Sequence, residues 1–262
     1  MPGTGQGHWP VVACDGDSGT VRYYIPATEE TIWAPAPVWG YWDFEGVLGG
    51  DPFDGTITWW VLEVALNTAI AQLADQPCGV MTMIIDADNN AEDAVISFGD
   101  QRSIDLNQGA NIEFGLSMPV LPTGGAVATG TSVVFGLAHD HNLDKDTVAS
   151  HVWFRLQGAA SILCESDDTT NDNDDVDTGI DLVAGEYHAF RINCLEMADV
   201  KFYVDGVRVC AGTTFDMTNC TADEAIMQPY ISLDKPAVTT VGTINLDYVR
   251  WWTNRSFYEG PA

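Results

Sequence analysis

The residues best placed to do chemistry in this sequence are the acidic side chains of Glu165-Ser166-Asp167. Successive side chains of a β-strand point to opposite faces, so carboxylates at alternate positions share one face. The strand pattern Glu-x-Asp-x-Glu thereby provides the closely spaced carboxylates that retaining glycoside hydrolysis requires, and Glu-x-Asp-x-x-Glu shares its first two members. Here the pair is followed by Asp168, Thr169 and Thr170, so the third carboxylate is absent. We therefore predict that the chain is not an enzyme and has no catalytic residues.

Other catalytic and metal-binding patterns are absent or weak. His139-Asp140-His141 is the one dense histidine motif, and its i, i+2 spacing would place two imidazoles on one strand face. No further ligands lie nearby in the sequence, so a polar loop explains the motif better than a metal site does. A nucleophile elbow, a Walker loop, a dinucleotide fingerprint and a His-Glu-x-x-His helix are also missing.

Two stretches concentrate aspartate, at residues 86–93 and 167–177. Oxygen ligands at short spacing suit Ca²⁺, although neither stretch matches the EF-hand loop. Turn formation and solubility also favour aspartate in loops, and this explanation stays open beside calcium binding. The candidate calcium ligands are Asp172, Asp174, Asp175 and Asp177.

The first 45 residues differ from the rest because they combine prolines and glycines with many aromatic side chains. Such a segment forms neither a continuous helix nor a central strand, yet its aromatic side chains favour a packed surface over water. We predict an extended arm that binds a partner, and the alternative is that the arm folds back over its own domain. The candidate partner-binding residues are Trp9, Tyr23, Tyr24, Trp33 and Trp39.

Carbohydrate binding is the alternative function that the aromatic residues leave open. Sugar recognition needs aromatic platforms beside polar groups, and several tryptophans outside the arm are available for this role. Core packing explains the same residues equally well, because each lies in a predicted strand. The tryptophans in question are Trp59, Trp60, Trp153, Trp251 and Trp252.

From residue 55 onward the chain reads as successive strands separated by turns. In 185–210 two hairpins follow one another, and the second contains Asp205-Gly206, the dipeptide typical of a type I′ turn. Residues 63–73 also have helical spacing, but the neighbouring Trp59 to Val64 favour a strand, so a helix is the less favoured interpretation. Further strands are predicted at 80–85, 112–118, 132–138, 152–157, 159–164, 227–233 and 243–252.

The net charge of −28 arises from 38 acidic and 10 basic side chains, of which only Lys145, Lys201 and Lys235 are lysines. A nucleic-acid binder needs a positive surface, and so does a protein that docks on anionic lipids, so we expect neither partner. The charge suits solubility or docking onto a basic partner. The N-terminus lacks the basic and apolar regions of a signal peptide, which predicts synthesis in a cytoplasm without classical secretion.

The run Phe202-Tyr203-Val204-Asp205-Gly206 resembles a motif of concanavalin A-like (laminin G-like) jelly-roll domains. Residues from about 56 to 252 are moreover similar, in the order of their features, to jelly-roll structural proteins of tailed bacteriophages. The resemblance also rests on the segments Ala74 to Asn90, Val134 to Ala138, Trp153-Phe154-Arg155, Pro229-Tyr230-Ile231 and Leu246 to Arg250.

This resemblance implies an all-β fold, an antiparallel jelly-roll β-sandwich at 46–253. The extended N-terminal arm at 1–45, predicted from composition, and a C-terminal tail at 254–262 lie outside the resemblance. The resemblance also implies a capsid decoration protein on the exterior of the virion, made in the host cytoplasm. The major capsid protein is then the expected partner. The expected oligomeric state is a homo-oligomer, with a trimer favoured. A carbohydrate-binding module of a phage head fibre or tail is the alternative, with a glycan as ligand and no required cofactor.

Overall fold

The computed structural model describes residues 12–14, 20–25, 30–35, 38–42, 61–65, 67–73, 79–99, 101–124, 130–142 and 145–253. Within these residues the chain consists of antiparallel strands joined by turns and short 3-10 helices. The jelly-roll β-sandwich predicted from the sequence is confirmed. No helix among the described residues is long and apolar enough to cross a membrane.

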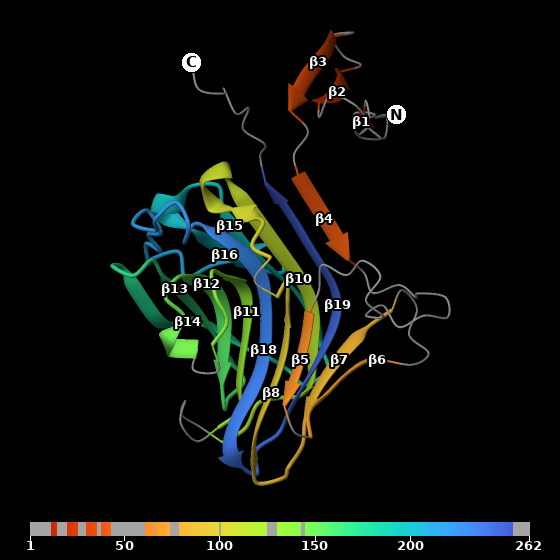
Figure 1. Ribbon diagram of the computed structural model, residues 1–262, viewed down its shortest axis with the longest axis vertical. Helices are drawn as coiled ribbons and strands as arrows, with labels where there is room; N and C mark the ends of the chain where they lie inside the picture. The colour runs from red at the N-terminus through yellow and green to blue at the C-terminus, as the bar shows by residue number, and fades with distance from the viewer. Residues whose placement is uncertain are drawn as a thin grey trace, which may run out of the picture.

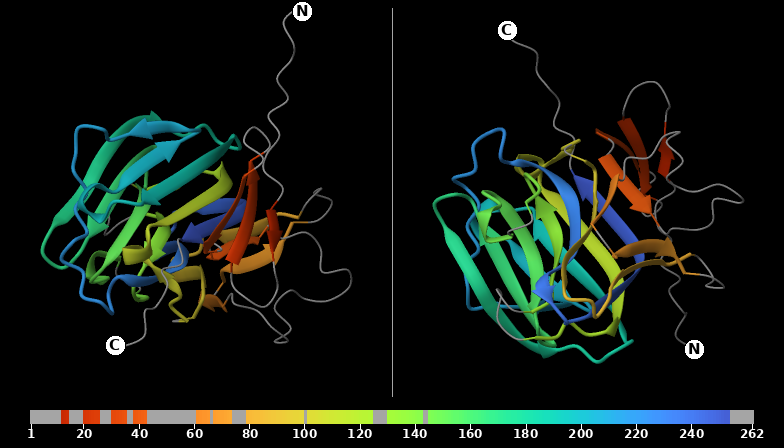
Figure 2. Two further views of the ribbon diagram at one scale, coloured as in Figure 1. Left: turned by 90° about the horizontal axis from the view of Figure 1, so that it is seen from above. Right: turned by 60° about the horizontal axis from the view of Figure 1, so that its bottom comes forward.

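Two sheets pack face to face (Figures 1 and 2). The first, here called the front sheet, has the strand order β14-β13-β12-β11-β18-β8-β5, and β9 also pairs with β18. In that order its strands are Asp172–Asp181, Ser161–Asp167, His151–Gln157, Ser132–Ala138, Ile226–Val238, Asn90–Ser97 and Val61–Ala65, with β9 at Ile104–Asp105.

The second, the back sheet, has the order β17-β16-β15-β10-β19-β7-β6. Its strands are Val207–Val209, Lys201–Val204, Tyr187–Cys194, Ala110–Val120, Gly242–Thr253, Met81–Ile85 and Ala69–Gln72. The 3-10 helices η1, η2 and η3 span Leu106–Gln108, Lys145–Thr147 and Met197–Asp199. A separate three-stranded sheet contains β1 (Val12–Cys14), β2 (Thr20–Ile25) and β3 (Glu30–Pro35).

The core lies between the two sheets and is built from inward-facing side chains at alternate strand positions. Phe135 of β11 is in its centre, with ring centroids 4.9 Å from Phe190 and 5.7 Å from Phe114 of the back sheet. Phe154 of β12 stacks beside it at 5.4 Å, and all four rings are fully buried. Edge-to-face contacts of this kind add to the stabilisation from apolar burial.

The second hairpin has the turn that its sequence predicts. β16 and β17 pair in register around Asp205-Gly206, whose φ angles are 50° and 79°. Positive φ at both central residues is the requirement of a type I′ turn, so this prediction is confirmed. At 61–72 the strands β5 and β6 form, so the strand interpretation is confirmed and the helical alternative is wrong. Each of the two pairs with a neighbouring strand, which satisfies its backbone along one edge.

Part of the predicted arm joins the sandwich. Strand β4 (Val38–Trp42) pairs with β19, with Trp39 opposite Trp252, and in Figure 1 it lies beside that strand. In β2, β3 and β4 the backbone pairing is described, whereas Trp9 and the tail at 254–262 lie outside the described residues. The boundaries 1–45 and 46–253 therefore stay predictions.

Gly136 of β11 supplies a test of how tightly the front sheet is packed. A Cβ atom at this position would collide with the carbonyl oxygen of Val152 and lie 2.5 Å from Cα of Trp153. Both contacts are with backbone, so relief requires β11 and β12 to separate. We expect Gly136→Ala to lower the free energy of unfolding, measured by urea denaturation, by at least about 2 kcal/mol.

Gly212→Ala is the matched control, because no heavy atom lies within 4 Å of its Cβ position. This variant should stay within about 0.5 kcal/mol of the parent protein. Equal stability of the two alanine variants would contradict the described pairing of β11 with β12.

Candidate ligand-binding pocket on the front sheet

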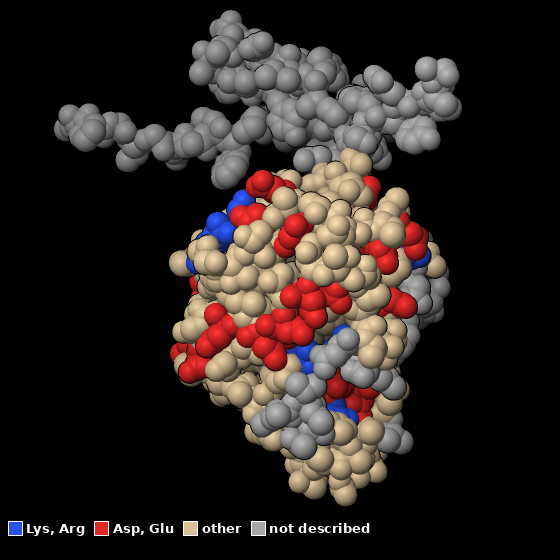
Figure 3. Space-filling model, turned by 90° about the vertical axis from the view of Figure 1, so that its left-hand side faces the viewer, with Lys and Arg blue, Asp and Glu red and all other residues tan. Residues whose placement is uncertain are grey.

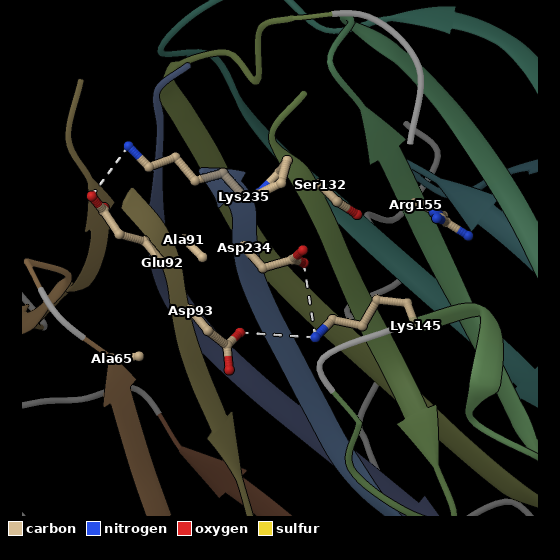
Figure 4. A pocket seen from close by; sticks show the side chains of 10 residues that line it. Ala65, Ala91, Glu92, Asp93, Ser132, Lys145, Arg155, Asp234 and Lys235 are labelled. Atoms are coloured by element: carbon tan, nitrogen blue, oxygen red, sulfur yellow. Dashed lines mark ion pairs between the residues drawn. The ribbon is translucent and has the colours of Figure 1, made fainter. Parts of the chain in front are cut away.

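A pocket of about 330 Å³ opens at the end of the front sheet where β8, β18 and β11 meet helix η2. Its walls combine small apolar residues with an unusual concentration of charge, as Figure 4 shows. Two of the three lysines in the chain line it. The charged and polar lining residues are Glu92, Asp93, Ser132, Lys145, Arg155, Asp234 and Lys235.

Lys145 of η2 is the centre of this pocket. Its Nζ lies 3.8 Å from Oδ1 of Asp93 on β8 and 3.8 Å from Oδ1 of Asp234 on β18. These ion pairs are longer than hydrogen bonds, and the one hydrogen bond that Nζ makes to a described residue is to the carbonyl of Asn142 at 3.0 Å. An ammonium group has three N–H donors, so Lys145 retains donors for a ligand.

Lys235 has a different role, although it follows Asp234 directly. Because side chains alternate along a strand, Lys235 points to the other side of β18 and pairs with Glu92 at 3.1 Å. Its Nζ also donates to the carbonyl groups of Asp86 and Asp88, the latter at 2.7 Å. Lys235 thus fastens the connection between β7 and β8, and we assign it a structural role.

Ser132 adds a neutral polar group to the pocket wall. It is 4% exposed, and its Oγ has no hydrogen-bond partner among the described residues. A buried hydroxyl without a partner is costly, and a ligand or a water molecule in the pocket would satisfy it. Together with Lys145 and the two aspartates it offers donors and acceptors converging on one cavity.

Glu165, the carboxylate singled out by the sequence, lies behind Arg155 and is closed to substrate. It is 1% exposed, accepts a hydrogen bond of 2.7 Å from Nε1 of Trp153, and lies 3.3 Å from Nη1 of Arg155. Burial raises the pKa of Glu165 from its ordinary value of 4.5 to about 7, outweighing the lowering effects of Arg155 and Trp153. The arrangement gives Glu165 the task of holding Trp153 and Arg155 in place.

The tryptophans and histidines that the sequence offered for binding pack mainly within the fold. Trp153 is fully buried, stacked on His151 at 3.7 Å, so it packs and offers no exposed sugar platform. His141 bonds to the hydroxyl of Tyr230, and His139 lies beside Arg102, which fits a polar loop. Trp251 and Trp252 are half-buried on β19.

The aspartates proposed as calcium ligands extend along β14, an edge strand, and their side chains are exposed. Within the described residues no group of three or more His, Cys, Asp or Glu side chains is arranged to hold a metal ion. Calcium binding therefore stays a prediction.

Asp168, in the loop before β14, has its carboxylate engaged internally. It accepts hydrogen bonds from the backbone N–H groups of Thr170, Asn171 and Asn219. Burial alone would raise the pKa of Asp168, but these hydrogen bonds lower it below its ordinary range. At least this carboxylate of the acidic stretch fixes the loop.

No protein-family model and no curated protein matches the sequence. Among solved structures, a protein of unknown function from Shewanella oneidensis MR-1 has a TM-score of 0.58 at 10% identity, covering 86% of this chain and 90% of that protein. The carbohydrate recognition domain of Emp46p in its potassium-bound form reaches 0.46 at 11% identity, over 76% and 90%. A carbohydrate esterase of Shiga toxin-encoding bacteriophage phi24B reaches 0.44 at 11%, over 75% and 90%. The first likeness shows a shared fold, and none assigns a function.

The raised pKa of Glu165 predicts a specific pH dependence. Between about pH 4.5 and 7 the folded protein holds a proton on Glu165 that the unfolded chain releases, so the contribution of this group to stability falls as pH rises through that window. We expect the stability of Glu165→Gln relative to the parent protein to increase by about 3 kcal/mol between pH 4.5 and 8, measured as the difference in unfolding free energy.

Glu186→Gln, which changes an exposed glutamate, is the control and should show no such pH-dependent difference. A flat difference curve for Glu165→Gln would mean that Glu165 is solvated and ionised in the folded protein.

Proposed function

We propose that the chain is a carbohydrate-binding module that takes a saccharide into the front-sheet pocket without transforming it. The observation that carries the proposal is the network of Lys145 with Asp93 and Asp234, which borders an open pocket. Paired charges of opposite sign present both donors and acceptors, and this is what a neutral polyhydroxylated ligand needs.

The size and lining of the pocket support the same class of ligand. A volume of about 330 Å³ lies at the small end of ligand sites in proteins. Ala65, Ala91 and Pro236 supply apolar wall area that a sugar C–H face can contact, beside the polar groups. The three cations and three carboxylates of the lining balance in charge, so a neutral sugar meets no net repulsion.

The absence of a catalytic step is part of this proposal. Asp93 and Asp234 are both paired to Lys145, and Glu165 is buried behind Arg155. Asp93 and Asp234 lie opposite each other in the strand register, but both are engaged by Lys145, so we propose no catalytic role for them.

Ala91→Trp tests the pocket directly. Ala91 is an exposed residue at the pocket, so an indole there should occlude the cavity without disturbing the core. On a glycan array we expect the parent protein to bind a subset of saccharides, and Ala91→Trp to weaken that binding at least about tenfold, which corresponds to 1.4 kcal/mol.

Val207→Trp is the control for a surface indole, because Val207 is 66% exposed on β17 of the other sheet. It should bind as the parent protein does. Saccharide binding that survives Ala91→Trp, or an array without any saturable signal, would disprove the pocket as a glycan site.

A second candidate function is the virion structural role implied by the sequence. The observation that favours it is the exposed edge strand β14, where Asp172, Asp174, Asp175, Asp177 and Asp181 face solvent. Acidic side chains form a band on the side of the molecule where β14 lies (Figure 3), and no lysine or arginine occurs between residues 156 and 190. Such a surface complements a basic partner. We propose that this partner is the major capsid protein, on the exterior of the capsid.

Under this second candidate the N-terminal arm, with Trp9, Tyr23, Tyr24, Trp33 and Trp39, makes the attachment, and the protein associates as a trimer. Deletion of residues 1–37, which leaves strand β4 paired with β19, should abolish co-sedimentation with undecorated capsids and leave the thermal unfolding of the sandwich intact. Full decoration by the truncated protein would rule out attachment through the arm.

A further inference from the structure

The outer face of the back sheet carries a row of charged and aromatic side chains that the pocket on the front sheet does not use. In the strand register Tyr203 of β16 lies opposite Arg191 of β15. Arg191 lies opposite Glu113 of β10, which in turn lies opposite Arg250 of β19. Directly opposed side chains on one face of a sheet are about 5 Å apart, so the four residues form a continuous row across four strands.

The two arginines of this row differ in whether a carboxylate pairs with them. Arg250 is 49% exposed and pairs with Glu113, its Nη2 lying 2.6 Å from Oε1. The side chain of Arg191 makes no hydrogen bond and no ion pair with any other described residue. Its guanidinium lies over the ring of Tyr203, 4.2 Å from the centroid, and its Nε is buried without a partner.

An unpaired guanidinium is unexpected in this protein. The chain has 38 acidic side chains for 10 basic ones, so carboxylates to pair with Arg191 are abundant. A guanidinium has five N–H donors, arranged in a fork that matches a carboxylate. Burying one of these donors without a hydrogen-bond partner costs free energy. Tyr203 fixes the orientation of the fork without using its donors. Arg191 is therefore preorganised for an anionic group from outside the chain.

Beside Arg191 the sheet carries two small residues and an aromatic ring. One step along the strands, Ala189 and Tyr248 lie opposite Gly115 on its two sides. The glycine allows the ring of Tyr248 to lie over the backbone, because a Cβ there would come within 2.6 Å of Cδ1 of the ring. The hydroxyl of Tyr248 donates to Glu113 at 2.8 Å, which holds the ring in place.

On the other side of the row the face continues with amide groups and a second ring. Asn111 lies opposite Asn193 and Trp252, and its Nδ2 is buried without a hydrogen-bond partner. The guanidinium of Arg250 lies 5.8 Å from the ring of Tyr248 and 5.9 Å from that of Trp252, so it sits between them. Rings alternating with donors give a face that is both apolar and hydrogen-bonding.

We propose that this face binds a carboxylate-bearing saccharide, with its carboxylate on Arg191 and its sugar ring on Tyr248. The bidentate fork selects the planar carboxylate, and the aromatic ring contacts the C–H face of the sugar. A single negative charge is also tolerated better than a phosphate dianion by a protein of net charge −28.

This site is separate from the pocket, because it lies on the outer face of the opposite sheet. The test is isothermal titration of the full chain with a glucuronate-containing tetrasaccharide and with its carboxyl-reduced neutral counterpart. The measurement is made at 0.15 M salt, which screens the long-range repulsion between the acidic protein and the anion.

We expect the acidic tetrasaccharide to bind, and the neutral one to bind at least about tenfold more weakly. Arg191→Met should cause a loss of similar size. Arg102→Met is the control for removing an arginine elsewhere, because Arg102, which precedes β9 of the front sheet, is already paired with Asp223 at 3.1 Å, and it should keep the parent affinity. Ala91→Trp should also keep it, which separates this site from the pocket.

Two further measurements keep the proposal falsifiable if Arg191→Met fails to fold. In the parent protein, amide resonances of β15 and β10 should shift on titration while those around Lys145 do not. Acetate should compete only weakly, whereas competition as strong as that of the saccharide would reduce the site to an anion site and overturn the proposal. Equal binding of the neutral tetrasaccharide, or no binding of the acidic one, would also overturn it.

Discussion

The structure depends on the alternation of side chains in two antiparallel sheets that share one aromatic core. Phe135, Phe154, Phe114 and Phe190 meet between the sheets, and each lies at a position whose sequence neighbours point outward. The hydrophobic effect that buries these rings is non-directional, whereas the pleat of a strand sends successive side chains to opposite faces. Once the residues that face the core are set, the residues that face outward are therefore set as well. Both candidate sites consist mainly of such outward-facing residues, held on strands that the core keeps in register.

The net charge of the protein conceals a difference between its surface, which is acidic, and its interior, where several cations are buried. The acidic excess lies on the surface, for example along β14, whereas Lys145, Arg155 and Lys235 are buried in one place. Burying charge costs desolvation energy that pairing repays only in part, so such a cluster is weak evidence of stability. Lys235 and Arg155 are each held by a carboxylate of the chain, Glu92 and Glu165, so Lys145 is the member of this cluster that we propose contacts a ligand.

The two outer faces of the sandwich offer different chemistry to ligands. On the front sheet the charges are paired and recessed, which suits a neutral ligand with many hydroxyl groups. On the back sheet Arg191 has no carboxylate partner among the described residues, and the rings of Tyr203 and Tyr248 lie near it, which suits an acidic ligand. The acidic edge β14 is a third surface, on which a basic protein partner would dock, so carbohydrate binding and a structural role on a virion are compatible in one chain.

The sequence by itself determined the fold class. The alternation of apolar and polar residues with a period of two and the Asp205-Gly206 turn are local properties of the sequence, and both indicate antiparallel strands. The sequence also lacks a third carboxylate at the spacing of the Glu-x-Asp-x-Glu pattern, since Thr169 and Thr170 follow Glu165-Ser166-Asp167 and Asp168. It did not reveal the pocket, because Asp93, Lys145 and Asp234 come from three distant segments. Nor did it reveal that Arg191 lies between Tyr203 and an already occupied Glu113. Which residues face one another across strands depends on sheet order and register, and these are set by non-local packing that only the tertiary structure decides.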